Sequence, residues 1–250
     1  MMPNTMPNPF FHTVFLDLDG TLLDHFEAIH RAHSHTRRHF GLSEPTMDDI
    51  HRAVGTGVNS AIEKIFAHDR PDLVPQAIPV YKTFWDANML DGVRLLPGAR
   101  ELLVELNRAG ARCAVLTNKH GPSSRKICEH LGVAHLLAGI FGATDTPWFK
   151  PQNELTIHAL TALGGESGQV ATRVGESGGV PGVCLIGDSI YDAQTGLNAG
   201  FPCYCVTTGT HSADELRAAG ASGVFADLEE VGRVVFGITT PRKTISEKAA

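Results

Sequence analysis

The sequence predicts an α/β fold in which a parallel sheet forms the core and a group of helices is inserted after the first strand. Three observations support this prediction. Short apolar runs recur and alternate with helical patterns, which is typical of a parallel sheet buried on both faces. Polar residues stand at the ends of several of these runs. One long stretch, residues 25–95, has helical periodicity without an intervening strand pattern.

Length and composition limit the class of protein. The chain has 250 residues and 42% hydrophobic content, enough for one large domain or two modest ones. Its formal net charge is -6, so it has no overall basic field to hold nucleic acid or an anionic membrane. The sequence has neither a run of about 20 apolar residues nor a signal-peptide pattern. We therefore expect a cytoplasmic protein. The sequence leaves open whether it is a monomer or a homodimer.

Five apolar runs bounded by turn residues are expected to form the sheet: Val14–Leu18, Cys113–Thr117, Gly139–Ala143, Val183–Gly187 and Cys203–Thr207. A helix is expected from near Pro97 to Gly110, because a proline stands at its start and a glycine just past its end. Another helix is expected from about Glu154 to Leu163. The five cysteines lack C-x-x-C spacing and predict neither a disulfide framework nor a zinc site.

The inserted stretch carries two apolar stripes at helical spacing. The first is Val54, Val58, Ile62, Ile65 and Phe66, and the second is Val74, Ile78, Tyr81, Trp85 and Met89. We therefore assign residues 11–24 and 96–237 to the core and residues 25–95 to a helical cap. Residues 238–250 are polar and are expected to form a flexible tail.

The first polar strand end contains two aspartates, Asp17 and Asp19, followed by Gly20 and Thr21. A turn beginning at Gly20 would let the Asp19 carbonyl and the Asp17 carboxylate face one small volume. That volume lies at the carboxyl end of a parallel strand, where open α/β sheets bind their ligands. The alternative interpretation is a solvated, aspartate-rich turn.

Three further polar signals follow at strand ends. Thr117 and Asn118 end an apolar run, and their hydroxyl, amide and backbone N–H groups can hold phosphate oxygens. Lys150 stands just before a proline and could neutralise phosphate charge. Asp188 and Asp192 lie four apart across a strand-to-helix turn, which suits the binding of a hard cation. Each signal alone has a structural alternative, such as a turn or a helix N-cap at Asp188, but together they indicate one site.

This four-part pattern resembles the haloacid-dehalogenase superfamily over most of the chain, from Phe11 to Val235. The cap between the first and second motifs resembles the type-one cap of phosphoglycolate-phosphatase-like members. The segment Val206–His211, followed by Glu215–Ala221 and Val224-Phe225, is similar to the end of that subgroup. The resemblance implies a Rossmann-like core and a Mg²⁺-dependent phosphatase, a phosphoric monoester hydrolase, that acts on a small phosphorylated metabolite.

By motif position, the resemblance also implies a role for each residue. Asp17 would be the nucleophile that forms an aspartyl-phosphate. Asp19 would be the general acid and then the general base, with a pKa that permits both states near neutral pH. Mg²⁺ would be bound by the Asp17 carboxylate, the Asp19 carbonyl and Asp188, and Asp192 would support these ligands. The phosphoryl group would be surrounded by Gly20, Thr117, Asn118 and Lys150.

Other activities remain open at this point. A sugar-phosphate mutase of the β-phosphoglucomutase type shares the motifs, but such mutases carry a Ser-Arg pair in the cap loop where this chain has Gly57-Val58. A dehalogenase would have no use for Asp19 or for a metal. The third alternative is a non-catalytic phosphate-binding protein on the same fold. The substrate stays open among phosphoglycolate, sugar phosphates, nucleotides and pyrophosphate.

Two features of the cap bear on substrate choice. Arg31, Arg37 and Arg38 on the first cap helix could steer an anionic substrate, although a solvated helix face is the simpler interpretation. The glycines of the loop Val54–Ser60 would let the backbone approach a ligand closely, so this loop is the better candidate for substrate contact.

Two further features of the core are an aromatic pair and a long insertion. Trp148 and Phe149 could form an aromatic lip for the substrate, with local packing as the alternative. The insertion Gly164–Gly182 is longer than the usual helix-to-strand connection of about 2–6 residues. We expect it to emerge far from Asp17, because the preceding helix runs away from the catalytic edge, and to hold a short hairpin around Val170–Val174.

Overall fold

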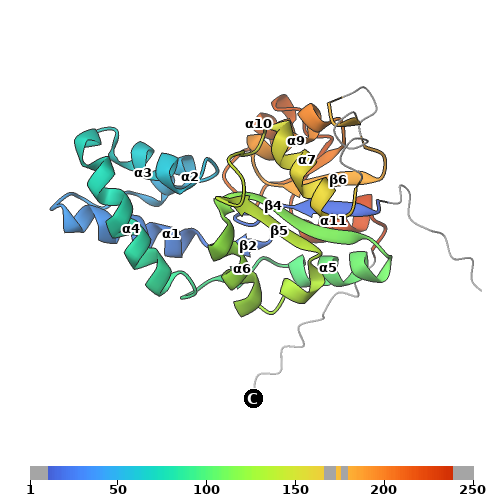
Figure 1. Cartoon of the computed structure of the whole chain (residues 1–250), viewed down its shortest axis with the longest axis horizontal. Helices are drawn as coiled ribbons and strands as arrows, with labels where there is room; N and C mark the ends of the chain where they lie inside the picture. The colour runs from blue at the N-terminus through green and yellow to red at the C-terminus, as the bar shows by residue number, and fades with distance from the viewer. Residues whose placement is uncertain (1–10, 166–172, 176–179, 239–250) are drawn as a thin grey trace, which may run out of the picture.

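The core of the molecule is a six-stranded parallel sheet with the order β5-β4-β1-β6-β7-β8 (Figure 1). The computed structural model describes residues 11–165, 173–175 and 180–238. The predicted α/β fold with inserted helices is confirmed. The strands of the sheet are β1 (Thr13–Leu16), β4 (Arg112–His120), β5 (Gly139–Ala143), β6 (Val183–Gly187), β7 (Cys203–Val206) and β8 (Gly223–Phe225).

The observed strands differ from the expected ones mainly at their ends. Strand β4 continues past Thr117 to His120, and its pairing with β5 shifts register after Leu116. Thr117 and Asn118 therefore lie within the last part of β4, and not after it. The sequence could not show this, because the polar residues there interrupt the apolar pattern that marks a buried strand.

Helices cover both faces of the sheet, as a parallel sheet requires. Leu16 and its neighbours on one face pack against the first group of helices, whereas Phe15 faces the second group, because successive strand residues point to opposite faces. The first group is α5 (Ala99–Arg108), α6 (Gly121–His130) and α11 (Leu228–Val235). The second group is α7 (Asn153–Ala162), α9 (Ile190–Ala199) and α10 (Ala213–Ala218). A short 3₁₀ helix, η2 (Ala134–Leu136), precedes β5.

The inserted helices form a separate group beside one edge of the core (Figure 1). They are α1 (Phe26–His39), α2 (Met47–Ala53), α3 (Val58–Phe66), η1 (Pro71–Leu73) and α4 (Val74–Asn88). Ile62, Phe66 and Tyr81, which belong to the two predicted stripes, are buried between them. We refer to residues 25–93 as the cap helices from here on.

A small antiparallel pair of strands, β2 (Leu23–Asp24) and β3 (Arg94–Leu95), joins the cap helices to the core. The sequence predicted no strand between residues 25 and 95, so β3 corrects that prediction. Each strand has two residues, which is too short to produce a period-two pattern. An ion pair between Asp24 and Arg94 links the two strands.

Most of the insertion Gly164–Gly182, including residues 170–172 of the expected hairpin, lies outside the described residues. Its described end lies at the edge of the sheet where the strands begin. The Gly182 carbonyl accepts hydrogen bonds from the backbone N–H groups of His12 and Thr13, at the start of β1. Asp17 follows the other end of β1, so this attachment agrees with an insertion remote from Asp17.

All five cysteines are buried, and none forms a disulfide. Burial raises the pKa of the Cys113 thiol and of the Cys128 thiol to about 12. They therefore serve as small apolar core residues. In the part of the chain that the structure describes, no helix combines the length and the apolar character needed to cross a membrane.

Helix α9 approaches β7 so closely that Gly196 has no space for a side chain. A Cβ atom there would lie 2.7 Å from Cys203 Cβ and 2.9 Å from the Phe201 carbonyl oxygen. We predict that Gly196→Ala lowers the free energy of unfolding by about 1–3 kcal/mol, since overpacking outweighs the gain in helix propensity. Urea denaturation measures this change.

The matched control is Leu197→Ala on the same helix, because Leu197 is 64% exposed. We expect that control to stay within about 0.5 kcal/mol of the wild type. A Gly196→Ala protein as stable as the wild type would contradict the close packing of α9 on β7.

Candidate active site

The predicted site residues come together at the edge of the sheet where the strands end. Asp17 directly follows β1, and Asp188 directly follows β6, the neighbouring strand. The backbone N–H of Asp17 donates to the Ile186 carbonyl oxygen at 2.9 Å, which extends the pairing of the two strands up to Asp17. Thr117 lies on β4, at the other side of β1. Parallel pairing thus places residues far apart in sequence next to one another.

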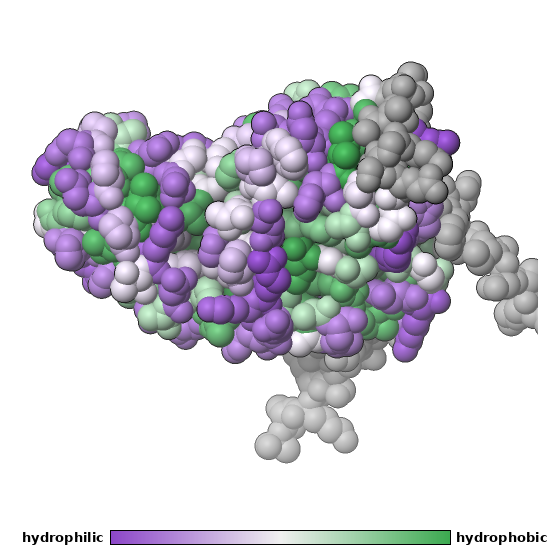
Figure 2. Space-filling model, viewed as in Figure 1, coloured by the Kyte–Doolittle hydropathy of each residue, from purple (hydrophilic) through white to green (hydrophobic). Residues whose placement is uncertain are grey.

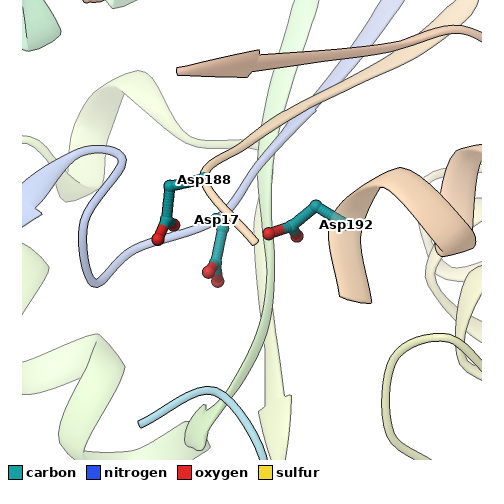
Figure 3. A group of neighbouring side chains, drawn as sticks. All are labelled: Asp17, Asp188 and Asp192. Carbon is teal, nitrogen blue, oxygen red and sulfur yellow. The ribbon is translucent and has the colours of Figure 1, made fainter. Parts of the chain in front are cut away.

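Three carboxylates gather in this place (Figure 3). One oxygen from each of Asp17, Asp188 and Asp192 lies within 4.8 Å of the others. All three side chains are buried, Asp192 completely. Lys150 contributes a buried ammonium, whose Nζ lies 2.9 Å from Asp17 Oδ1 and 2.6 Å from Asp192 Oδ1. The cluster therefore contains three acids and one base.

Asp188 is fixed by groups from two other segments. Thr21 Oγ1 donates to Asp188 Oδ1 at 2.9 Å, and the Thr210 backbone N–H donates to Oδ2 at 3.3 Å. Gly20 and Gly209 both approach the Asp188 carboxylate so closely that a Cβ at either position would overlap it. Gly20, which has a φ of +80°, must therefore be a glycine, because a larger residue there would overlap the Asp188 carboxylate.

Asp192 is held by the start of its own helix. Ser189 is the N-cap of α9, and its side chain and backbone N–H both donate to Asp192 Oδ2, at 2.5 and 3.1 Å. The N-cap alternative for Asp188 is thus wrong, because the next residue fills that position. With Oδ1 bound to Lys150, both oxygens of Asp192 are engaged. This suits a supporting role better than direct ligation.

The electrostatics of the cluster indicate missing positive charge. Burial raises the pKa of Asp17 to about 6, the Lys150 ammonium opposes this effect, and the Asp192 carboxylate adds to it. Burial also raises the pKa of Asp188 well above its usual range, together with repulsion from Asp17 and Asp192. Burial would lower the pKa of Lys150, but the carboxylates of Asp17 and Asp192 raise it. An oxygen-rich cavity with two surplus negative charges fits a divalent cation.

Asp19 has surroundings that differ from those expected. Lys119 Nζ lies 2.9 Å from one Asp19 oxygen, and His25 Nδ1 lies 3.6 Å from the other. Burial would raise the pKa of Asp19, but the Lys119 ammonium and His25 outweigh it and hold that pKa well below its usual range. The expectation of a pKa near neutrality therefore needs correction: Asp19 is ionised in this arrangement.

Lys119 is in turn held by the cap helices. Its Nζ lies 4.7 Å from the centre of the Trp85 ring, over the ring face, in a cation–π contact. Trp85 belongs to α4, so a cap helix touches the partner of Asp19. Sequence reasoning missed Lys119, His25 and Trp85. The only available signal was the position of Lys119 directly after the second motif, since contacts made by the cap cannot be predicted from periodicity.

Thr117 and Asn118 act on different neighbours. The Thr117 side chain favours the ionised form of Asp17 and so lowers its pKa, and its hydroxyl oxygen accepts a hydrogen bond from the Lys119 backbone N–H at 3.2 Å. The Asn118 amide donates to the Gly55 carbonyl at 2.8 Å and to the Lys150 carbonyl at 3.2 Å, and its oxygen accepts from the Lys150 backbone N–H. Both amide hydrogens are thus committed. In this arrangement the Asn118 side chain positions Lys150 and the loop Val54–Ser60. Phosphate binding at Asn118 stays a prediction.

A pocket lies between the strand ends and the cap helices. From the core it is lined by Asp17, Asp19, Thr117, Asn118, Lys119, His120, Lys150, Asp188, Ser189 and Thr210. From the cap it is lined by Ile29, His33, Val54, Gly55, Gly57, Val58, Ala61, Tyr81 and Trp85. The cap loop, Val54–Ser60, therefore reaches the site, as expected. We call this space the catalytic pocket.

The three arginines of α1 do not line the catalytic pocket. Arg37 is buried and binds Asp69 and the Ile65 carbonyl, so it holds the cap helices together. Arg31 pairs with Asp91 near the surface, at 3.4 Å. The suggestion that these arginines steer the substrate has no support in this arrangement.

The fold and this set of strand-end residues define a hydrolase class, and comparison with known proteins agrees. Residues 14–206 match the family described as haloacid dehalogenase-like hydrolase, and the chain belongs to that family. The haloacid dehalogenase-like family hydrolase from Streptococcus pneumoniae has a similar structure. Its TM-score is 0.73 at 22% identity, over 88% of this chain and 96% of the other.

Within the family, the chain is similar to proteins named phosphoglycolate phosphatase. The one from Caulobacter vibrioides is 28% identical over 91% of this chain and 92% of its own length. The one from Agrobacterium fabrum is 30% identical over 80% of this chain and 82% of its own length. The resemblance to phosphoglycolate-phosphatase-like members is confirmed.

Because the cluster has surplus negative charge, we expect the removal of the Asp17 carboxylate to stabilise the protein. Because the pKa of Asp17 is raised from 3.8 to about 6, the folded protein binds this proton more tightly than the unfolded chain. The contribution of Asp17 to the free energy of unfolding therefore falls as the pH rises from about 4 to about 6. We predict that Asp17→Asn, in chelator, raises the melting temperature at pH 8 by at least about 3 °C and changes it much less at pH 4.

Differential scanning calorimetry at both pH values measures this effect. The matched control is Asp214→Asn, because the Asp214 side chain is 96% exposed and should show little change at either pH. An Asp17→Asn protein that melts below the wild type at pH 8 would show that the cluster is not short of positive charge.

Proposed function

We propose that this chain hydrolyses small phosphate monoesters with the help of Mg²⁺, through an aspartyl-phosphate on Asp17. That it is a phosphatase, a phosphoric monoester hydrolase, follows from its family and from its relatives. The observation that carries the finer proposal is the buried cluster of Asp17, Asp188 and Asp192 around the Lys150 ammonium. Such a site attracts a cation and, through it, a phosphate.

The donor set supports Mg²⁺ in particular. The three acids of the cluster offer carboxylate oxygens, which are the ligands that a hard cation prefers. They offer neither nitrogen nor sulfur. Asp17 and Asp188 would bind the ion, with the Asp19 carbonyl as a further ligand. Asp192 would support them through Lys150. When bound, the ion would neutralise charge on the phosphate and on the nucleophile.

In the first half of the reaction, an Asp17 carboxylate oxygen forms a bond to phosphorus while the bond from phosphorus to the ester oxygen breaks. Asp19 gives its proton to that departing oxygen. In the second half, a water attacks the phosphorus, Asp19 takes the proton from the water, and the Asp17 carboxylate is released. Lys150, already 2.9 Å from Asp17, would balance the charge of the transferring group.

Asp19 can fill this role only after its surroundings change. The Lys119 ammonium keeps Asp19 ionised in the absence of substrate. A bound phosphate dianion would attract Lys119 away from Asp19, and Asp19 could then take up the proton that it must donate. Gly20 and Thr117 would complete the surroundings of the phosphoryl group, with Asn118 positioning Lys150.

A mutase and a non-catalytic binding protein are less well supported. The cap loop brings Gly55, Gly57 and Val58 to the pocket, and none of them has a side chain that could hold a second phosphate. A non-catalytic binding protein is disfavoured because the family and the named relatives are enzymes. The names of the relatives make phosphoglycolate the first substrate to test. We also propose that residues 25–95 act as one cap domain.

The proposal is tested with p-nitrophenyl phosphate at neutral pH. We predict turnover with Mg²⁺, its loss in EDTA, and its recovery when Mg²⁺ is restored. Asp17→Asn should lower kcat by at least about a thousandfold, because an amide cannot attack phosphorus. If Asp17→Asn kept a tenth of the wild-type rate, or if EDTA left the rate unchanged, Asp17 would not be a nucleophile next to a metal.

The role of Asp19 predicts a dependence on the leaving group. We expect Asp19→Asn to slow hydrolysis by at least about 10²-fold for alkyl phosphates, and by less for p-nitrophenyl phosphate, whose leaving group needs no proton. Asp91→Asn, at an exposed carboxylate outside the pocket, is the matched control and should keep the wild-type rate. Equal losses for both kinds of ester would exclude proton donation by Asp19.

A further inference from the structure

The cap side of the catalytic pocket carries no charge at neutral pH, among the residues that the structure describes. Its side chains are aliphatic or aromatic, with His33 as the one basic group. His33 is buried against the Tyr81 ring, with centroids 4.6 Å apart. Burial lowers the pKa of His33 to about 3, so its imidazole is neutral. A substrate anion on this side would have no cation to meet.

The cations on the core side are already matched. Lys119 is paired with Asp19, and Lys150 is paired with both Asp17 and Asp192. Asp188 adds a further acid. The four acids and two lysines that surround the catalytic pocket sum to a charge of -2, which a divalent cation would only neutralise. A carboxylate on the leaving group, in addition to the phosphate, would therefore add unbalanced negative charge to a buried site.

The catalytic pocket continues into a larger space, which we call the outer groove. The two share Gly57, Val58, Tyr81, Trp85 and His120. The outer groove lies between helices α3 and α4 on one side and the segment after β5 on the other, where Thr144 and Phe149 line it. Its volume is about 600 Å³, against about 60 Å³ for the catalytic pocket. In the space-filling view the outline of the molecule is indented between the cap helices and the core (Figure 2).

The lining of the outer groove combines apolar side chains with the uncharged polar side chains of Thr56, Asn59, Ser60 and Thr144. Val58, Tyr81 and Trp85 form its inner part, next to the catalytic pocket. At its outer part, Phe149 is 37% exposed, one of the few large apolar side chains left open to solvent, and its ring lies close to Gly57. The charged residues of the rim are Glu63, Lys82 and Asp86, so the rim also has a surplus of one negative charge.

From these observations we propose, on the basis of the function proposed above, a specific class of substrate. The preferred substrate is a phosphate monoester whose leaving group is uncharged, mainly apolar and long enough to extend from the catalytic pocket into the outer groove. Trp85 and Phe149 determine this specificity. The compound after which the relatives are named, a short ester with a carboxylate, is a poor substrate for this chain.

Two matched pairs of substrates test the proposal. Phosphoglycolate and its amide have the same size and differ in charge. We expect kcat/KM to be at least about tenfold higher for the amide, because like charges repel in a buried site. Ethyl phosphate and 2-phenylethyl phosphate differ by an apolar ring. We expect kcat/KM to be at least about tenfold higher for the phenylethyl ester, through burial of that ring.

A variant of Phe149 tests whether the preference for phenylethyl phosphate over ethyl phosphate arises in the outer groove. Phe149→Ala should lower the ratio of kcat/KM between phenylethyl and ethyl phosphate by at least about threefold. Val234→Ala, on α11, removes another exposed apolar side chain outside both spaces and should leave the ratio unchanged. A ratio that Phe149→Ala does not alter would exclude the outer groove as the site of the leaving group.

p-Nitrophenyl phosphate separates the failure of this proposal from the failure of the proposed function. If it is hydrolysed in a reaction that needs Asp17, and phosphoglycolate exceeds both its amide and the phenylethyl ester, the proposed substrate class is overturned and the phosphatase mechanism stands. If no ester is hydrolysed under any metal condition, both are overturned. The expected result is hydrolysis of p-nitrophenyl phosphate together with both preferences.

Discussion

The structure depends on the burial of three carboxylates against a single ammonium. Asp17, Asp188 and Asp192 are removed from water beside Lys150, an arrangement that destabilises the folded chain unless a cation completes it. The surrounding segments hold these carboxylates in place. Parallel strands bring Asp17 and Asp188 together, Thr21 holds one oxygen of Asp188, and Ser189 holds Asp192. A site that is unstable when empty is well suited to capture a divalent ion and an anion together.

The core of the site could be predicted from sequence because its residues stand at strand ends. Once Asp17, Thr117 and Asp188 are assigned to the ends of parallel strands, the topology places them at one edge. Lys119 could not be predicted, since its contacts with Asp19 and Trp85 depend on how the cap helices fold back over the core. Arg37 looked like a surface cation, but it is buried, because its pairing with Asp69 across the cap is invisible to helical periodicity.

The cap helices and the core meet at the reacting groups themselves. Asn118 binds the Gly55 carbonyl of the cap loop and both backbone groups of Lys150, so the position of the loop and the position of the ammonium are linked. Trp85 covers Lys119, the partner of Asp19. A movement of the cap helices would therefore shift Lys150, which is bound to Asp17, and Lys119, which is bound to Asp19, at the same time. This geometry connects ligand entry to the chemical state of the site.

The two linkers that carry the chain into and out of the cap helices pair with each other, Leu23 with Leu95 and Asp24 with Arg94. The ends of the inserted segment are consequently adjacent, and the chain enters and leaves the cap helices at one place on the core. A segment attached in this manner can be exchanged for another of different shape without disturbing the strands that carry Asp17 and Asp188. Evolution, or a protein engineer, can thus alter what the enzyme recognises by replacing one contiguous cassette while the catalytic groups are inherited intact.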